Sequence, residues 1–189
     1  DRLFTSVMTD HGKLGKSLAD AVIQGKAVKV GILSGNQSQL GMRQRLKSVK
    51  DKLEEAGIEI SWILSEKELD KKMRNVEYFA EQPVDTVISL DNDDTEKAVD
   101  IILNDDRISW KLYGEGRSEK LIYYLDKGTI QELAVPNEYY MGYQSIVLAA
   151  QNIRYYTDKT EQAEVEFYMV SKDNLYDEET SRILFPAVR

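Results

Sequence analysis

The chain has 189 residues, contains no cysteine, and carries 25 basic against 33 acidic residues, for a net charge of −8. This length allows one domain or two small ones, with a core large enough to fold without disulfides. The lack of cysteine excludes disulfides, thiolate zinc sites, iron–sulfur clusters and a cysteine nucleophile. The negative charge argues against a nucleic acid partner held by bulk charge.

Short apolar runs alternate with segments of helical periodicity along most of the chain. Residues 27–33 form a β-branched run, and residues 39–56 repeat apolar positions at helical spacing up to Gly57. The expected elements in chain order are strand 4–8, helix 10–23, strand 27–33, helix 39–56, strand 58–64, helix 66–81, strand 86–90, helix 93–104, strand 110–113, helix 118–126, strand 131–135, helix 138–156 and strand 164–170.

This alternation predicts an α/β fold, a doubly wound and mainly parallel sheet with helices on both faces. Ligands of such sheets bind at the carboxyl ends of the strands. The loops to consider are therefore residues 34–39, 91–94, 114–117 and 136–140.

Few residues suggest catalysis or a cofactor. Asp10 is expected to cap a helix with the single histidine, His11, exposed in its first turn, in preference to an Asp–His catalytic pair. No G-x-S-x-G elbow, dinucleotide fingerprint or phosphate loop is present. The acidic run Asp91–Asp94 could bind a divalent cation, but helix capping explains it more simply. We expect no enzyme activity, no metal and no cofactor.

Two arginines lie near the start of the helix predicted at 39–56. Arg43 and Arg45 oppose the helix dipole there, so each needs another reason for its place. One possible reason is an ion pair with a neighbouring acid. The second is a role as a bidentate hydrogen-bond donor that points into a cleft toward hydroxyls or a carboxylate. The sequence leaves both open.

Six segments carry short motifs in a fixed order over nearly the whole chain. They are VMTDHGKLGKSLADAV, KVGILSGNQSQLGMRQRLKSVKDKLEEAGIEI, VDTVISLDNDDTEKAVDII, LYGEGRSEKLIYYLDKGTI, AVPNEYYMGYQSIVLA and VEFYMVSKDNLYDEETSRILFP. The first resembles D-N-x-x-x-G-x-x-x-A, the second contains R-x-R, the fourth resembles G-F-D-G, and the fifth resembles Q-x-P-Y-x-M-G-Y. In this order they resemble the C-terminal lobe of type 1 periplasmic sugar-binding proteins, the ribose and galactose group, whose ligand domain is shared with lactose-repressor-type regulators.

The resemblance implies a lobe of the periplasmic binding protein-like I fold that closes on a sugar. It also implies a set of ligand contacts at the strand ends and near the starts of the first two helices. These are Arg43, Asp91 or Asn92, Glu115, Asp10 and Asn137. Three positions depart from the family pattern. Glu115 replaces an aspartate, Pro136 stands where the family has glutamine, and Asp91 would stand where the family has asparagine if Asp91 and not Asn92 is the matching residue.

Proteins of this family have two lobes, so the resemblance implies that the N-terminal lobe is missing. Residues 1–137 would form the C-terminal lobe, 138–170 a helix and strand that cross to the missing lobe, and 171–189 a tail that returns. The start at Asp1 would mark a truncation near the first crossover. The crossing elements would expose apolar side chains, so we expect the fragment to form a homodimer. The side chains concerned are Met141, Ile146, Val147, Leu148, Ile153, Phe167 and Met169.

The expected function is non-catalytic binding of a small polar solute, such as a sugar, outside the cytoplasm. The partner would be an ABC permease or a surface sensor. One alternative is the effector domain of a lactose-repressor-type regulator, in the cytoplasm. A small α/β enzyme is a second alternative, although no group of residues supports it.

Overall fold

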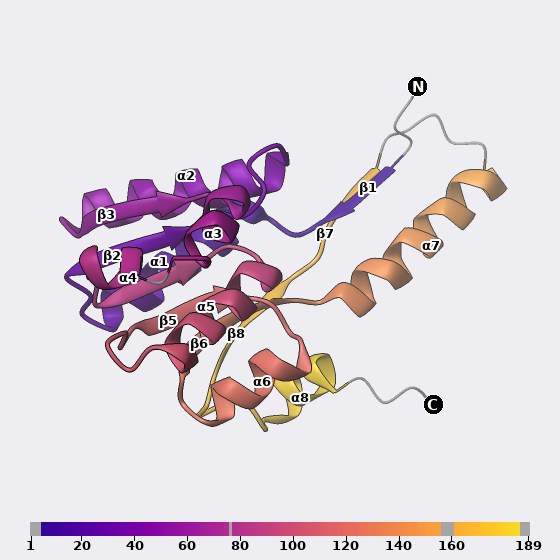
Figure 1. Cartoon of the computed structure of the whole chain (residues 1–189). Coiled ribbons are helices and arrows are strands. Elements are labelled where there is room, and N and C mark those ends of the chain that lie inside the picture. Colours follow the sequence, from indigo (N-terminus) through magenta and orange to yellow (C-terminus); the bar gives the residue numbers. More distant parts are fainter. Residues whose placement is uncertain (1–4, 76, 156–160, 186–189) are drawn as a thin grey trace.

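The computed structural model describes residues 5–75, 77–155 and 161–185. A six-stranded sheet in the order β3-β2-β4-β5-β6-β8 forms its centre (Figure 1). Strand β8 is antiparallel to β6, and the other neighbours pair in parallel. The strands are β2 (Lys29–Leu33), β3 (Glu59–Leu64), β4 (Thr86–Ser89), β5 (Lys111–Glu115), β6 (Ile130–Pro136) and β8 (Phe167–Ser171).

Helices cover both faces of this sheet, so its strands are buried on two sides. The helices α1 (His11–Gln24) and α2 (Leu40–Glu55) pack on one face, where Val30, Ile32 and Ile88 point. The other face, with Val87 and Leu112, is covered by α3 (Glu66–Lys72), α4 (Glu77–Glu81), α5 (Asn92–Asn104), α6 (Glu119–Asp126) and α8 (Glu178–Leu184). The doubly wound, mainly parallel α/β sheet expected from the sequence is confirmed.

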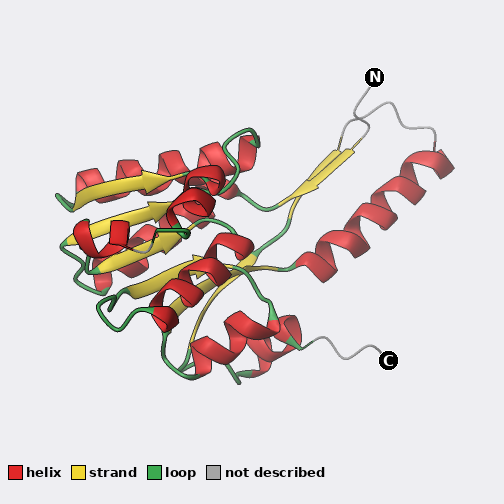
Figure 2. Ribbon diagram, viewed as in Figure 1, coloured by secondary structure: helices red, strands yellow, loops and turns green. Residues whose placement is uncertain are grey.

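Three elements leave the sheet together. Helix α7 (Glu138–Tyr155) follows the carboxyl end of β6, and β1 (Thr5–Met8) pairs in parallel with β7 (Glu161–Glu164). Figure 2 shows this helix and two-stranded ribbon extending from the side toward which the parallel strands point. Ile146 and Ile153 on α7 are 72% and 77% exposed, so most of this helix has no apolar partner among the described residues.

The structure differs from the sequence prediction in four places. The expected helix at 66–81 is two helices, α3 and α4. In place of the single expected strand at 164–170 there are two strands, β7 and β8. Strand β8 pairs with β6 in the central sheet, whereas the sequence analysis expected it to cross away from the lobe. Phe167 and Met169 of β8 consequently pack against the core, and Leu148 of α7 is buried rather than exposed. The tail contains a helix, α8, that the sequence analysis did not identify.

Gly31 in the centre of β2 leaves space for an indole ring. A Cβ atom on this residue would lie 2.2 Å from the Trp62 ring of the neighbouring strand β3. Trp62 in turn packs against Phe79 and Trp110, with ring centroids 6.0 Å away in both cases. The glycine therefore fixes how closely this aromatic cluster approaches the sheet.

We predict that Gly31→Ala lowers the free energy of unfolding by about 1–3 kcal/mol, as overpacking of a filled core does. In a Trp62→Leu background the same change should cost clearly less, because the ring that the methyl group meets is gone. Urea unfolding of the four proteins of the double-mutant cycle measures this. Equal costs in both backgrounds would contradict the contact.

Candidate functional site

The carboxyl ends of β4 and β5 bring polar side chains from several elements to one place. Asp91 lies two residues after the end of β4 and caps α5, because its carboxylate accepts a hydrogen bond of 3.0 Å from the Asp94 amide. Glu115 ends β5, and the chain then turns at Gly116, where φ is +140°. A Cβ atom on Gly116 would lie 2.5 Å from Asn92 Oδ1, so glycine is needed both for the turn and for this close approach.

Arg45 lies beneath this edge and connects it to the opposite layer of helices. Its side chain is only 5% exposed, and one guanidinium nitrogen lies 3.3 Å from Glu115 Oε2. The same nitrogen donates to the Leu90 carbonyl at 2.5 Å, and Nε donates to His11 Nδ1 at 3.1 Å. Arg45 of α2 thus contacts the start of α1, the end of β4 and the end of β5.

Glu115 has an unusual protonation equilibrium for a carboxylic acid. Its side chain is 12% exposed. Burial raises the pKa of Glu115 to about 7, against the opposing effect of the Arg45 cation, while the negative charges of Asp91 and Glu138 add to the increase. A carboxyl group that is only partly ionised near neutrality can accept or donate a hydrogen bond.

A second buried acid lies behind the same edge. Asp94 in α5 is fully buried, accepts a hydrogen bond from the Gly35 amide at 3.2 Å, and lies 3.4 Å from Lys97 Nζ. Burial and the nearby Asp91 charge raise the pKa of Asp94 to about 6. Asp91 and Asp94 therefore serve helix capping and loop anchoring. Within residues 5–75, 77–155 and 161–185, no cluster of histidine and acidic side chains is arranged to hold a metal ion.

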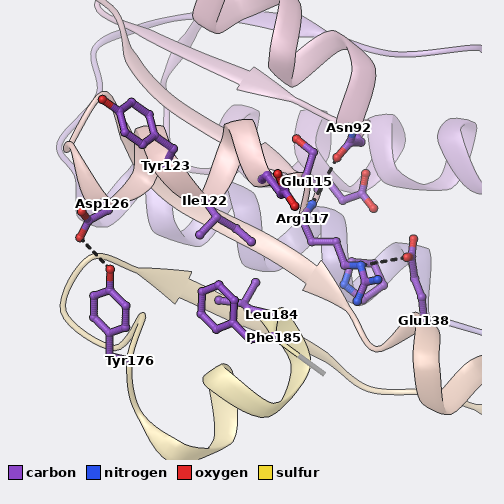
Figure 3. Close-up of a pocket in the computed structure, with 14 residues that line it drawn as sticks. Asn92, Glu115, Arg117, Ile122, Tyr123, Asp126, Glu138, Tyr176, Leu184 and Phe185 are labelled. Carbon is purple, nitrogen blue, oxygen red and sulfur yellow. Dashed lines mark hydrogen bonds and ion pairs between the residues drawn. The ribbon is translucent and has the colours of Figure 1, made fainter. Parts of the chain in front are cut away.

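An open pocket of about 900 Å³ begins at Glu115 and Asn92 and extends between α6 and α8 (Figure 3). Arg117 crosses its mouth. The Arg117 amide donates to Asn92 Oδ1 at 3.2 Å, and its guanidinium Nε lies 3.1 Å from Glu138 Oε2. The far end is lined by Tyr123 and by Tyr176. The pocket therefore presents donors and acceptors at the sheet edge and aromatic rings away from it.

The structure brings only some of the ligand-contact residues expected from the sequence to the same pocket. Asn92 and Glu115 line the same pocket, and Asp91 is close enough to affect the Glu115 charge. Arg43 is exposed and donates to the carbonyls of Gln37 and Ser38 at 2.9 and 2.8 Å, which ties it to the loop before its own helix.

The other two expected residues also have local partners. The Asp10 carboxylate caps α1 by accepting from the Lys13 amide at 2.9 Å. Asn137 accepts from the Tyr140 amide at 3.0 Å, and it lines a smaller pocket with Glu164, Glu166 and Tyr168. None of the described contacts links Asp10 or Asn137 to Glu115.

The sequence analysis did not select the residues that support Glu115. Its expectation of an exposed His11 was wrong, because the ring is half-buried and bonded to Arg45. Of the two arginines, Arg45 is the one in a buried ion pair. A signal was available, since Arg45 is four and eight residues before the buried Val49 and Leu53 and therefore shares their helix face. Arg117 was recognisable only as a loop residue.

The family to which this architecture belongs follows from the sequence comparison. Residues 4–156 match the family described as periplasmic binding protein domain. The chain belongs to this family. The sheet order, the alternating helices and the projecting α7 therefore form part of a periplasmic binding protein of type 1 fold.

Several solved structures share this fold at low sequence identity. A carbohydrate transporter solute-binding protein from Agrobacterium radiobacter, in complex with D-arabinose, matches with a TM-score of 0.83 and 17% identity over 96% of this chain and 65% of its own. GanP, a glucose-galactose binding protein from Geobacillus stearothermophilus, matches with a TM-score of 0.78 and 20% identity over 93% and 65%. A putative LacI transcriptional regulator from Bacteroides fragilis reaches 0.73 and 13% over 89% and 62%.

This periplasmic binding protein domain spans about two thirds of the length of those structures or slightly less. No curated protein sequence matches it significantly. Among the helices of the described residues, none has the length and apolar character that a membrane crossing requires.

We predict that Arg45→Met destabilises the protein by about 3 kcal/mol at pH 8, because it leaves the Glu115 carboxylate buried without a cation. The loss should be smaller at pH 5. The folded-state pKa of Glu115 lies above its ordinary value of 4.5, so stability falls as the pH rises from there to about 7, and the cost of the ionised group is fully present above about 7. Urea unfolding at both pH values measures the difference.

Arg43→Ala is the matched control for this prediction. It removes an arginine of the same helix whose contacts are exposed, so unfolding should change little at either pH. A loss for Arg45→Met that is the same at pH 5 and pH 8 would contradict the pairing with Glu115.

Proposed function

We propose that this domain is one lobe of a solute-binding protein and binds a small neutral polyhydroxylated ligand, such as a sugar, without chemical change. The observation that carries the proposal is the group at the sheet edge. Glu115 is held by a buried arginine, and beside it Asn92 opens into the same pocket. Pockets that recognise small polar ligands combine a few fixed polar groups with an apolar lining.

The chemistry of these groups suits hydroxyl groups. A carboxylate accepts hydrogen bonds, an amide both donates and accepts, and a guanidinium donates. Glu115, Asn92 and Arg117 supply all three at the pocket mouth. Nearby Asp91 and Glu138 add negative charge, which disfavours an anionic ligand such as a sugar phosphate. We therefore propose Asn92 and Glu115 as ligand contacts, because both line the pocket. Asp91 caps α5 and lies behind them, and Asp10, Arg43, Asp91 and Asn137 stay predictions.

We further propose that a companion N-terminal lobe closes over this edge. The solved structures that this chain matches over almost its full length are about half as long again. The exposed Ile146 and Ile153 of α7 would then pack on that lobe together with the β1–β7 ribbon. In this division the elements from α1 to β6, together with β8 and α8, form the present lobe, and α7 and the β1–β7 ribbon cross to the other.

We place the whole protein outside the cytoplasm, as the binding component of ABC-type uptake or of a surface sensor. The matched carbohydrate transporter component supports this context. An effector domain of a transcription regulator is the second candidate, supported by the similarity to the Bacteroides fragilis regulator. The encoded sequence upstream of this domain separates the two, since a lipoprotein leader favours uptake or sensing and a helix-turn-helix favours regulation.

We predict that Glu115→Gln weakens sugar binding at least tenfold at pH 8, because hydrogen bonds to a charged acceptor contribute about 1.5–3 kcal/mol. D-arabinose, D-fucose, D-galactose and D-ribose are suitable probes. Titration calorimetry or amide chemical shifts at millimolar sugar should be used, since one lobe offers only part of the contacts and binds weakly.

Glu81→Gln is the matched control, because Glu81 is an exposed glutamate of α4 that lies outside this pocket. It should leave sugar binding unchanged. The proposal fails if no sugar perturbs the amides around Asn92 and Glu115, or if the two glutamate variants bind sugar equally well.

We also predict that this domain, produced alone, forms a homodimer through the apolar side chains of α7. Light scattering should report twice the mass of one chain at micromolar concentration. Ile146→Lys with Ile153→Lys should return the mass to that of a single chain, because two charges on this face disfavour its burial. A single-chain mass for the unmodified domain would contradict the prediction.

A further inference from the structure

The imidazole of His11 is fixed between two helices. Its Nδ1 accepts the hydrogen bond from Arg45 Nε, so the neutral ring carries its proton on Nε2. The other edge of the ring faces Gly41 of α2, where a Cβ atom would lie 2.5 Å from His11 Nε2. The ring therefore fills the space that a side chain at position 41 would need, and it has one orientation from which it can hold Arg45.

Arg45 depends on this contact for its direction. Its guanidinium makes three described contacts, one each with the His11 ring, the Leu90 carbonyl and the Glu115 carboxylate. The backbone fixes the Leu90 carbonyl, but a carbonyl alone constrains only one nitrogen. The bond at Nε sets the rotation of the planar group, and a planar fork must be oriented before it can pair well with a carboxylate.

We propose that His11 is a proton-sensitive positioning residue for ligand binding. While Nδ1 is unprotonated it holds the Arg45 guanidinium against Glu115, and protonation of the ring releases Arg45 and weakens the binding of a polyhydroxylated ligand. This inference rests on the proposed function for the role of Glu115 as a ligand contact. A protonated Nδ1 cannot accept a hydrogen bond and repels the guanidinium.

The charged groups near His11 shift its pKa in opposite directions. Burial and the Arg45 cation lower the pKa of His11 below its usual 6.5, and the neighbouring Asp10 carboxylate opposes this. Behind Arg45 lie the acids of the sheet edge, Glu115 on β5 and Asp91 after β4. Because Glu115 also titrates, the pH dependence of ligand affinity should contain a Glu115 phase near pH 7 and a separate His11 phase at lower pH.

The first experiment needs no ligand. His11 is the single histidine of the chain, so its imidazole resonances can be assigned without ambiguity and titrated by NMR. We expect a pKa below 6.5 that rises in Arg45→Met, because the nearby cation is gone. In His11→Leu, the carbon-13 signal of the Glu115 carboxyl group should report a pKa above the wild-type value, since Arg45 is no longer held beside it. An unchanged Glu115 titration in His11→Leu overturns the proposal.

The second experiment measures the affinity for D-arabinose and D-galactose between pH 5 and pH 8. His11→Leu should weaken binding at least fivefold at pH 8. His11→Asn should restore most of this loss, because the Asn Oδ1 can take the place of Nδ1 as acceptor, and it should lack the low-pH phase. Lys16→Ala, an exposed change on the same helix, is the control and should bind as the wild type does.

Thermodynamic linkage gives a signature that a merely structural role would not produce. If the protonated ring weakens binding, saturating sugar must lower the pKa of His11. A His11 pKa that the sugar leaves unchanged, or a low-pH phase that persists in His11→Asn, overturns the proposal. If neither sugar binds at any pH, the proposed function fails, and the Glu115 titration in His11→Leu still decides whether His11 positions that carboxyl group.

Discussion

The buried ion pair between Arg45 and Glu115 is the interaction on which the proposed ligand-binding edge of the sheet depends. Arg45 comes from the helix layer on one face of the sheet and reaches the ends of two central strands. Taking two charges out of water is costly, and such a pair is stable only when further hydrogen bonds satisfy it. His11 and the Leu90 carbonyl accept hydrogen bonds from Arg45. Arg45 is thereby held beside the Glu115 carboxylate.

This arrangement leaves an unequal distribution of charge. Glu115, Asp91 and Asp94 lie within one short stretch of sheet edge, and burial raises the pKa of two of them, Glu115 to about 7 and Asp94 to about 6. Near neutral pH, these acids therefore resist carrying a further negative charge. A ligand that brings hydroxyl donors relieves this state, whereas an anion would worsen it. The same buried acids that lower stability thus favour a neutral polar ligand.

The remaining architecture keeps this edge open. Helix α7 and the β1–β7 ribbon leave the sheet on the side toward which the parallel strands point and extend away from it (Figures 1 and 2). The proposed function needs such an open edge, because a ligand would have to enter before the proposed second lobe covers it. The pocket beside Glu115 is crossed at its mouth by the ion pair between Arg117 and Glu138. Such a partly exposed pair contributes little stability and can reorganise around a ligand.

The sequence by itself determined the order of elements, the parallel sheet, the family resemblance and the position of Glu115 and Asn92, because periodicity, caps and short motifs are local. It also predicted a helix cap in the Asp91–Asp94 run, and the structure assigns that cap to Asp91. Only the tertiary structure decided that Arg45 and not Arg43 pairs with Glu115, that His11 accepts a hydrogen bond from Arg45, and that β8 joins the central sheet. Arg45 is 34 positions from His11 and 70 positions from Glu115 in the chain. Whether such distant side chains meet depends on how α1 and α2 pack against the ends of the strands.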